Sequence, residues 1–464
     1  MVNVPEHPSY ASFPVFRAID TRPASRLDRF LSIFADVRGG EGAGALLLSA
    51  NIFLLLAAYY LLKTAREPLI LTEQGAVVKT YLSAGQALLL LLIVPAYSWL
   101  ASRLKRAWLL AGVSLFFAAN LAVFYSAAAA GSRIGIPFYL SVGIFNVFAI
   151  SQFWAFANDL YTEPQGKRLF PLIGVGASIG AVAGARAAAG AVKELGALPL
   201  LVAGGVLLAV CALLTIAADR RISERAGAEQ LLARQQPLKP GDGFALIFQD
   251  RYLVMIAFLV LLLNVVNTSG EFLLSSLVTQ EAARVAGAGP EAEEARRRFI
   301  GAFFGDYFFW VNTLSFLFQA FLVSRLFRYI GVGGTLLILP LVAFSGYSLL
   351  LAAPVLGVIR LLKILENSAD YSIQNTARQA LFLPTPREVK YKAKAAIDTF
   401  FQRAGDVTQA GIVYAGTHLF ALGISGFAAL NLLLTLVWLG LVMFLAREYR
   451  RRSAAPAAPS GVFS

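Results

Sequence analysis

The chain alternates long apolar runs with short polar segments over most of its 464 residues. A helix that spans a bilayer needs about 20 predominantly apolar residues. Runs of this kind predict twelve spans, at residues 44–63, 81–101, 107–127, 136–158, 169–190, 196–218, 253–276, 301–324, 330–351, 355–378, 397–419 and 424–446. The pattern therefore predicts an all-α integral membrane protein with twelve transmembrane helices.

One long polar segment, residues 219–252, divides the predicted spans into two sets of six. Lysine and arginine are concentrated in this segment, in both tails and in every second loop. Because cytoplasmic loops of membrane proteins carry an excess of Lys and Arg, we expect both termini in the cytoplasm. The predicted organisation is a cytoplasmic N-terminal tail, a six-helix half, a cytoplasmic linker, a second six-helix half and a cytoplasmic C-terminal tail, at 1–43, 44–218, 219–252, 253–446 and 447–464.

The composition agrees with this prediction and excludes several other classes of protein. Charged residues make up 14% of the chain, whereas they reach roughly a quarter of a soluble protein. The net charge of +13 is dispersed over short loops, so membrane topology explains it and we expect no nucleic-acid partner. With one cysteine and two distant histidines, no metal site is expected. The sequence contains no phosphate-binding loop and no nucleophile elbow, so neither an enzyme activity nor a cofactor is expected.

The tenth predicted span contains charged residues where each of them is costly. A charged side chain at the centre of a spanning helix costs about 2.5 to 3.5 kcal/mol on insertion scales. At about 100° per residue, the polar positions of this span share one stripe of the helix. The stripe consists of Arg360, Lys363, Glu366, Asp370, Gln374 and Arg378. Either it lines a translocation cavity, which we favour, or its members form ion pairs along the helix at three- and four-residue spacing.

Two further spans contain polar groups that need partners. In the seventh span, Glu271 follows Asn264 and Asn267, and a carboxylate inside a membrane indicates a coupling or substrate site unless it makes a structural hydrogen bond. In the eleventh span, Arg403 and Asp406 form a weaker candidate because long side chains near an interface can reach water. The fifth span has glycines at 176, 180 and 184, a spacing that favours close packing against another helix.

The plan of six helices, a cytoplasmic loop and six helices resembles the major facilitator architecture, in which two halves rock about a central site. Two N-terminal segments also resemble the ATP/ADP translocase family of plastids and obligate intracellular bacteria. In YYLLKTAREPLILTEQGAVVKTYL, Lys63 and Arg66 fall on the family's two basic positions, Glu67 on an acidic one, and Thr64 where the family has aspartate. In FWAFANDLYTEPQGKRLFPLIGVGASIGAVAG, the matching residues are Trp154, Phe156, Ala157, Asn158, Lys167, Arg168 and Pro171.

A third segment, SADYSIQNTARQALFLPTPREVKYKAKAAIDTFFQRAGD, resembles the family's tenth span and the loop that follows it. The matching residues are Tyr371, Ser372, Arg378, Pro384, Lys392, Lys394 and Asp398. Glu271 also falls where the family has a glutamate in its seventh span.

The resemblance implies a nucleotide antiporter of the bacterial inner (plasma) membrane that works by alternating access. Its expected partners are the lipid bilayer and a small anionic substrate, with a nucleotide as the first candidate, and carriers of this layout can work as monomers. The substrate-binding residues implied are Lys63, Arg66, Asn158, Glu271, Arg360 and Lys363. The residues implied for coupling or gating are Glu366, Asp370, Arg403 and Asp406. The cytoplasmic mouth contains Lys167, Arg168, Arg378, Lys392 and Lys394.

The sequence departs from the family where substrate charge is concerned. Asp370 and Asp406 each stand where the family's nucleotide exchangers have lysine, and Gln379 replaces a glutamate. A site for ATP, with about four negative charges, gains from each cation and loses from each added carboxylate. One alternative is therefore a proton-coupled carrier of a smaller organic solute that uses Glu366, Asp370, Asp406 and Asp306. A membrane sensor without transport is a third, lesser hypothesis.

Overall fold

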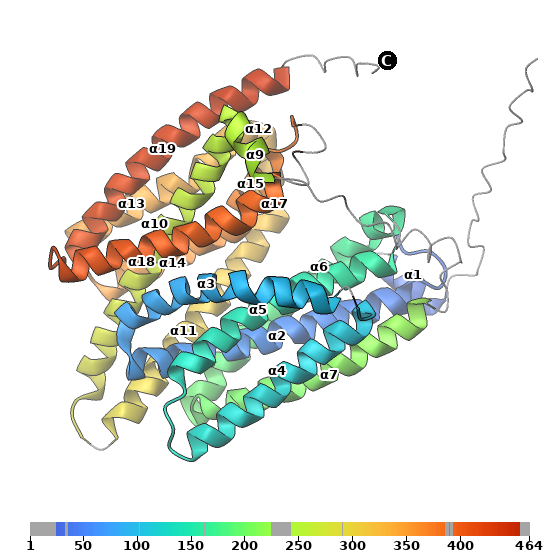
Figure 1. The fold of residues 1–464 in the computed structure, drawn as a ribbon, viewed down its shortest axis with the longest axis horizontal. Helices are drawn as coiled ribbons and strands as arrows, with labels where there is room; N and C mark the ends of the chain where they lie inside the picture. Colours follow the sequence, from blue (N-terminus) through green and yellow to red (C-terminus); the bar gives the residue numbers. More distant parts are fainter. Residues whose placement is uncertain are drawn as a thin grey trace, which may run out of the picture.

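The computed structural model describes residues 25–32, 36–101, 103–161, 163–223, 243–289, 291–385, 389 and 393–454, and every regular element among them is a helix. The helices form two bundles (Figure 1). The first bundle contains α1 (Arg26–Leu31), α2 (Gly42–Glu73), α3 (Gly75–Ala101), α4 (Arg106–Ala129), α5 (Gly135–Leu160), α6 (Glu163–Leu195) and α7 (Leu198–Ser223).

The second bundle contains three helical paths that are interrupted by π-helical turns. Its elements are α9 (Gly243–Gln249), α10 (Arg251–Ala286), α11 (Ala292–Leu317), the π turn η1 (Phe318–Leu322), α12 (Val323–Leu336), α13 (Ile338–Ala352), α14 (Leu356–Ala369), the π turn η2 (Asp370–Gln374), α15 (Asn375–Ala380), α17 (Ala393–Ala396), the π turn η3 (Ile397–Phe401), α18 (Gln402–His418) and α19 (Ile424–Ala454).

The hydropathy pattern located these helices well, and the all-helical membrane fold is confirmed. In the described part of the chain, eight helices are long and apolar enough to cross a membrane, while α13 is shorter, with 15 residues. The count of twelve spans stays a prediction. Several helices are longer than the apolar runs indicated: among them, α2 continues past residue 63 to Glu73, and α3 begins at Gly75 instead of residue 81. Several charged residues expected near a loop are therefore inside helices.

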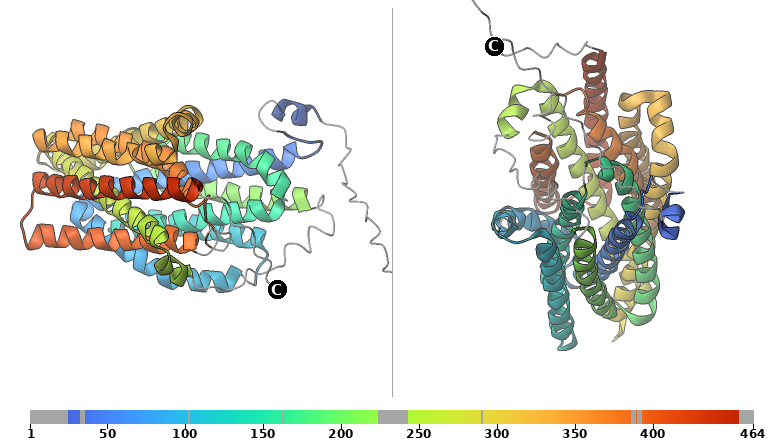
Figure 2. Two further views of the ribbon diagram at one scale, coloured as in Figure 1. Left: turned by 90° about the horizontal axis from the view of Figure 1, so that it is seen from above. Right: turned by 90° about the vertical axis from the view of Figure 1, so that its right-hand side faces the viewer.

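The two bundles meet mainly through α11 on α6 and α2, and through α18 and α10 on α3. We call the end where α7 finishes and α10 begins the linker end, and the other the far end. At the far end the packing is tight: a Cβ on Gly301 of α11 would lie 2.1 Å from Val192 Cγ1 of α6, and one on Gly305 would lie 2.6 Å from Ala189 Cα. The ribbons of the two bundles diverge toward the linker end (Figure 1). Figure 2 shows the same helices from above and end-on.

The glycine repeat of the fifth predicted span packs α6 onto the backbone of α2, as its spacing predicted. A Cβ built on Gly180 would lie 2.2 Å from the carbonyl oxygen of Phe53, and one on Gly184 would lie 2.5 Å from that of Ala57. Gly176 approaches Ser49 in the same way. Because backbone atoms cannot yield as a flexible side chain does, each of these positions requires glycine.

We expect Gly180→Ala to destabilise the protein by about 1–3 kcal/mol because its methyl group overlaps the α2 backbone. The same change at Gly174 is a matched control. Gly174 lies on the same helix, and a Cβ built there meets nothing within 4 Å. Alanine favours a helix over glycine, so Gly174→Ala should be neutral or slightly stabilising. Thermal unfolding of the purified variants measures both effects, and equal melting temperatures for the two would contradict the packing argument.

Candidate functional site

Lys63 lies where the two bundles meet, surrounded by aromatic rings. Its ammonium nitrogen is 4.2 Å from the centroid of the Phe308 ring on α11, 5.5 Å from that of Tyr60 and 5.8 Å from that of Tyr59. Among the described residues, no carboxylate lies within 4.0 Å of this ammonium. The rings attract the cation without neutralising it. This group of four residues, the Lys63 cage, therefore leaves a positive charge available to an anion between the two halves.

The next turn of α2 carries a charged group that also connects the halves. Arg66 covers the Tyr139 ring, with 4.4 Å from the guanidinium carbon to the ring centroid, and its Nε donates to Glu67 Oε1 at 3.2 Å. Lys79 of α3 donates to Glu67 Oε2 at 2.6 Å and to Ser275 Oγ of α10 at 2.9 Å. Glu67 and Lys79 are buried. Lys79 thus links the N-terminal half to the C-terminal half.

Lys363 and Glu366 of α14 are buried inside the C-terminal half. The Lys363 ammonium donates to Asn267 O at 3.0 Å, to Asn267 Oδ1 and to Glu366 Oε2 at 3.1 Å. Glu366 Oε2 also accepts a bond from the Tyr347 hydroxyl at 3.4 Å. The exposed fractions of the two charged side chains are 0% and 1%. The sequence allowed either a cavity-lining stripe or ion pairs along the helix, and Lys363 and Glu366 form such an ion pair.

Glu271 occupies the turn of α10 between the residues that bind the two buried lysines. Asn267 precedes it by one turn and contacts Lys363, and Ser275 follows it by one turn and contacts Lys79. Its carboxylate accepts a hydrogen bond from Asn367 Nδ2 at 3.2 Å, and the same amide donates to the Tyr307 hydroxyl at 2.6 Å. One face of α10 thus presents polar groups to lysines of both halves.

The polar stripe expected on the tenth span is not continuous. Arg360 lies apart from the Lys63 cage, at the far end, where its Nη2 is 3.3 Å from Asp306 Oδ2 of α11. Beyond Glu366, the π turn Asp370–Gln374 adds a residue to the helix path. A π turn rotates the following residues by about 100° relative to a regular helix. Arg360, the Lys363–Glu366 pair and the residues from Asp370 onward therefore have different surroundings. A helical projection with 100° per residue places them on one stripe and does not show this difference.

The π turn places Asp370 on a pocket of about 310 Å³ between α10 and η2. Asn267, Tyr371, Arg378 and Gln402 also line this pocket. Arg378 lies 3.8 Å from Asp398. Asp370 consequently faces the pocket beside Arg378, whose positive charge is partly balanced by Asp398.

Asp406, the second aspartate that replaces a family lysine, has its charge balanced locally. Its Oδ2 is 3.1 Å from Arg403 Nη1 on the same helix, and its Oδ1 accepts from Asn264 Nδ2 at 2.7 Å. The Asn264 amide also donates to Gln402 O at 2.8 Å. Arg403 and Asp406 thus pair three residues apart on α18, and Asn264 of α10 holds the two helices together through Asp406 and Gln402.

The predicted mouth residues that the structure describes lie at the linker end. Arg168 of α6 forms two bonds to the Glu41 carboxylate, at 2.9 and 2.8 Å, which fix the start of α2. Lys394 is half-buried on α17, and Asn158, which was predicted to bind substrate, is exposed near the end of α5. Lys392 and the side chain of Lys167 lie outside the described residues.

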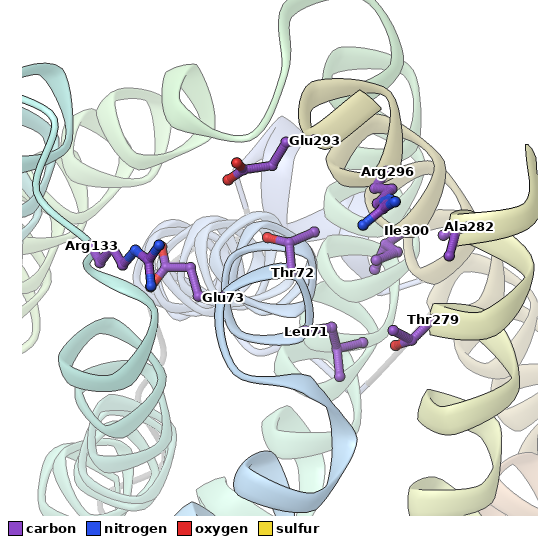
Figure 3. Close-up of a pocket in the computed structure, with 10 residues that line it drawn as sticks. Leu71, Thr72, Glu73, Arg133, Thr279, Ala282, Glu293, Arg296 and Ile300 are labelled. Carbon is purple, nitrogen blue, oxygen red and sulfur yellow. The ribbon is translucent and has the colours of Figure 1, made fainter. Parts of the chain in front are cut away.

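A small pocket of about 210 Å³ separates the two halves at the far end (Figure 3). One side consists of Leu71, Thr72, Glu73 and Arg133, and the other of Thr279, Ala282, Ala283, Glu293, Arg296 and Ile300. The Glu73 carboxylate accepts the backbone N–H of Gly135 at 2.9 Å, which holds the end of α2 against α5.

Two sequence comparisons relate the chain to ATP/ADP transporters. A sequence model described as TLC ATP/ADP transporter matches residues 305–449. The chain is also 22% identical over 348 residues to ADP,ATP carrier protein 1 of Chlamydia muridarum, a match that covers 65% of this chain and 63% of that protein. The chain is a distant homologue of the ATP/ADP translocases. Its match thus spans less than two thirds of the length of this relative.

Solved structures show that this translocase homologue has a major-facilitator-like fold. A bacterial homologue of the human lysosomal transporter Spinster, in an inward-facing and unoccupied conformation, has a TM-score of 0.60 at 14% identity and covers 90% of this chain and 100% of its own. An auto-inhibited POT family peptide transporter has a TM-score of 0.59 at 13% identity, with 91% and 99% covered. The translocase family and these neighbours are transporters and not enzymes.

Proposed function

We propose that the protein is a secondary transporter that exchanges nucleotides, ATP and ADP or a related anion, across the inner membrane by alternating access of its two halves. The observation that carries this proposal is the Lys63 cage. It combines a cation that has no carboxylate partner among the described residues with three aromatic rings, at the junction of the halves. A phosphate pairs with a lysine, and aromatic rings stack on a nucleobase.

The charges around the cage are compatible with an anionic substrate. Asp406 is balanced by Arg403, and Glu366 by Lys363. Asp370 and Asp406 are the carboxylates of spans ten and eleven that replace family lysines and disfavour a nucleotide, and of these two only Asp370 lies on the 310 Å³ pocket.

We further propose that the linker end faces the cytoplasm, with both termini on that side, and that the divergent bundles of the structure represent an inward-facing state.

Exchange in proteoliposomes tests this proposal. We expect vesicles that contain the purified protein and internal ADP to take up labelled ATP, and empty vesicles to take up much less, because exchange needs a substrate on both sides. A chemical proton gradient should then have little effect on the rate. If a correctly folded sample exchanges no nucleotide in either direction, the proposal fails.

A second candidate, proton-coupled transport of a smaller solute, is favoured by one observation. In the described part of the chain, the buried Oε1 atom of Glu366 has no hydrogen-bond partner. Burial of an unpaired carboxylate oxygen is costly, and protonation relieves that cost. In this case uptake would follow a pH gradient and Glu366→Gln would abolish that dependence, whereas nucleotide exchange without a gradient would exclude the candidate.

A further inference from the structure

An open cavity lies away from the Lys63 cage, at the far end of the bundles. It has a volume of about 900 Å³. One face of α11, from Ala295 to Asp306, forms its floor, and the start of α14 forms one wall. Lys193, from the end of α6, contributes from the other half of the protein. We call this cavity the α11 groove.

The α11 groove carries charges of both signs. Its cations are Lys193, Arg298 and Arg360, and its carboxylates are Glu281 and Asp306. The Arg360–Asp306 pair is open to its surroundings, with exposed side-chain fractions of 35% and 47%. Lys193 is exposed and has no ion-pair partner among the residues that the structure places. Arg298 is also paired with Glu294 at 3.0 Å, and Glu281 with Arg284 at 2.5 Å, each within its own helix. A ligand of the groove therefore meets Lys193 and the Arg360–Asp306 pair, with these two paired groups beside them.

The surroundings of the groove place it at the depth of lipid headgroups. On one side of it, Trp310 is 45% exposed and Leu361 is 58% exposed, directly beside the turns that carry Asp306 and Arg360. On the other side, α11 begins with the charged residues Glu293 to Arg298. Tryptophan is enriched where a helix passes from the hydrocarbon core to the interface. Phe299, Phe303 and Val355 give the groove apolar surface as well.

We propose that the α11 groove binds a phospholipid with a phosphoethanolamine headgroup in the leaflet at the far end. The lipid phosphate pairs with Arg360, Arg298 and Lys193, and the primary ammonium, which has three N–H donors, pairs with Asp306 and Glu281. A choline headgroup has no N–H donor, and a glycerol headgroup has no positive charge for the carboxylates. Because Lys193 belongs to one half and the remaining residues to the other, the bound lipid stabilises closure of the far end.

Lipid retention by the purified full-length protein tests the proposal. Native mass spectrometry, or thermal shift in detergent, should show stronger binding and stabilisation by dioleoyl phosphatidylethanolamine than by the phosphatidylcholine or phosphatidylglycerol with the same chains. Arg360→Gln and Asp306→Asn should each reduce this preference about three- to fivefold, as expected for an exposed charge contact. Arg328→Gln, at an exposed position of α12 outside the groove, is the matched control and should change nothing.

Each other outcome overturns the proposal. Equal effects of ethanolamine and choline lipids would show that the ammonium is not recognised, and a preference for the glycerol lipid would indicate an anionic-lipid surface. If soluble phosphoethanolamine or ATP reproduced the effect with the same dependence on Arg360, the groove would be a vestibule for free phosphates. Nucleotide exchange is measured separately, so failure here leaves the proposed transport function to its own test.

Discussion

Replacing Lys63 by methionine is expected to weaken nucleotide binding about 10- to 100-fold, the usual effect of losing a hydrogen bond to a charged group. Methionine keeps the length and the apolar stem that pack against Phe308, Tyr59 and Tyr60, so the fold should persist. Isothermal titration of the purified variant with ATP measures the affinity. Exchange in proteoliposomes should fall in parallel because the same cation compensates the phosphate during the movement of the halves.

The control for this variant is Lys105→Met, which removes the same charge from an exposed position before α4. It should bind ATP as the unmodified protein does. Equal affinities for Lys63→Met and Lys105→Met would show that the cage is not the phosphate site. A large loss of thermal stability in Lys63→Met alone would instead assign the lysine a structural role.

Replacing Glu67 by glutamine should open the far end of the protein. The change leaves the Lys79 ammonium buried without its carboxylate, and removal of one partner of a buried ion pair costs about 3–5 kcal/mol. Lys79 also donates to Ser275 of the opposite half, so it is buried in this way only while the far end is closed. The substitution therefore destabilises the closed conformation of the far end. Water reaches the lysine when the far end opens, so an equilibrium between the two arrangements shifts toward the open one.

Spin labels can measure this opening because the single cysteine of the chain, Cys211, is buried. Cysteines introduced at Ser132 and Ala288, exposed in far-end turns of the two halves, should give a longer mean distance in Glu67→Gln than in the parent. Glu448→Gln, which breaks a pair with Arg452 within α19 at the linker end, should leave the distance unchanged. An unchanged distance in Glu67→Gln would mean that this ion pair does not hold the far end closed.

The sequence predicted the helices more completely than the site. Apolar runs must be helical in a bilayer, where each backbone polar group needs a partner within its own segment. The same reasoning identified the buried charges of the tenth span, Glu271 and the glycine repeat of α6. These features depend on composition and spacing alone, and neither changes when the helices are arranged in space.

The partners of those charges could not be predicted in the same way. Lys79 stood between two predicted spans, and only the continuation of α3 to Gly75 brings it inside the bundle. Asn367, Tyr307 and Tyr347 are polar residues in apolar helices, a weak signal that becomes specific only when Glu271 and Glu366 lie opposite them. Arg360 was assigned to the same stripe as Lys363, and both lie on α14. Their partners differ because Arg360 faces Asp306 of α11 and Lys363 faces Asn267 of α10, which the sequence of one helix cannot show.

The π turn at Asp370–Gln374 has a consequence for how such a site diverges between relatives. A π turn is the form in which a helix accommodates one additional residue without being broken. Every side chain after the insertion turns to a new direction, while the residues themselves stay the same. A relative that lacks the additional residue would direct the counterparts of Asn375 and Arg378 elsewhere, so a single insertion or deletion can alter the lining of the cavity without any substitution.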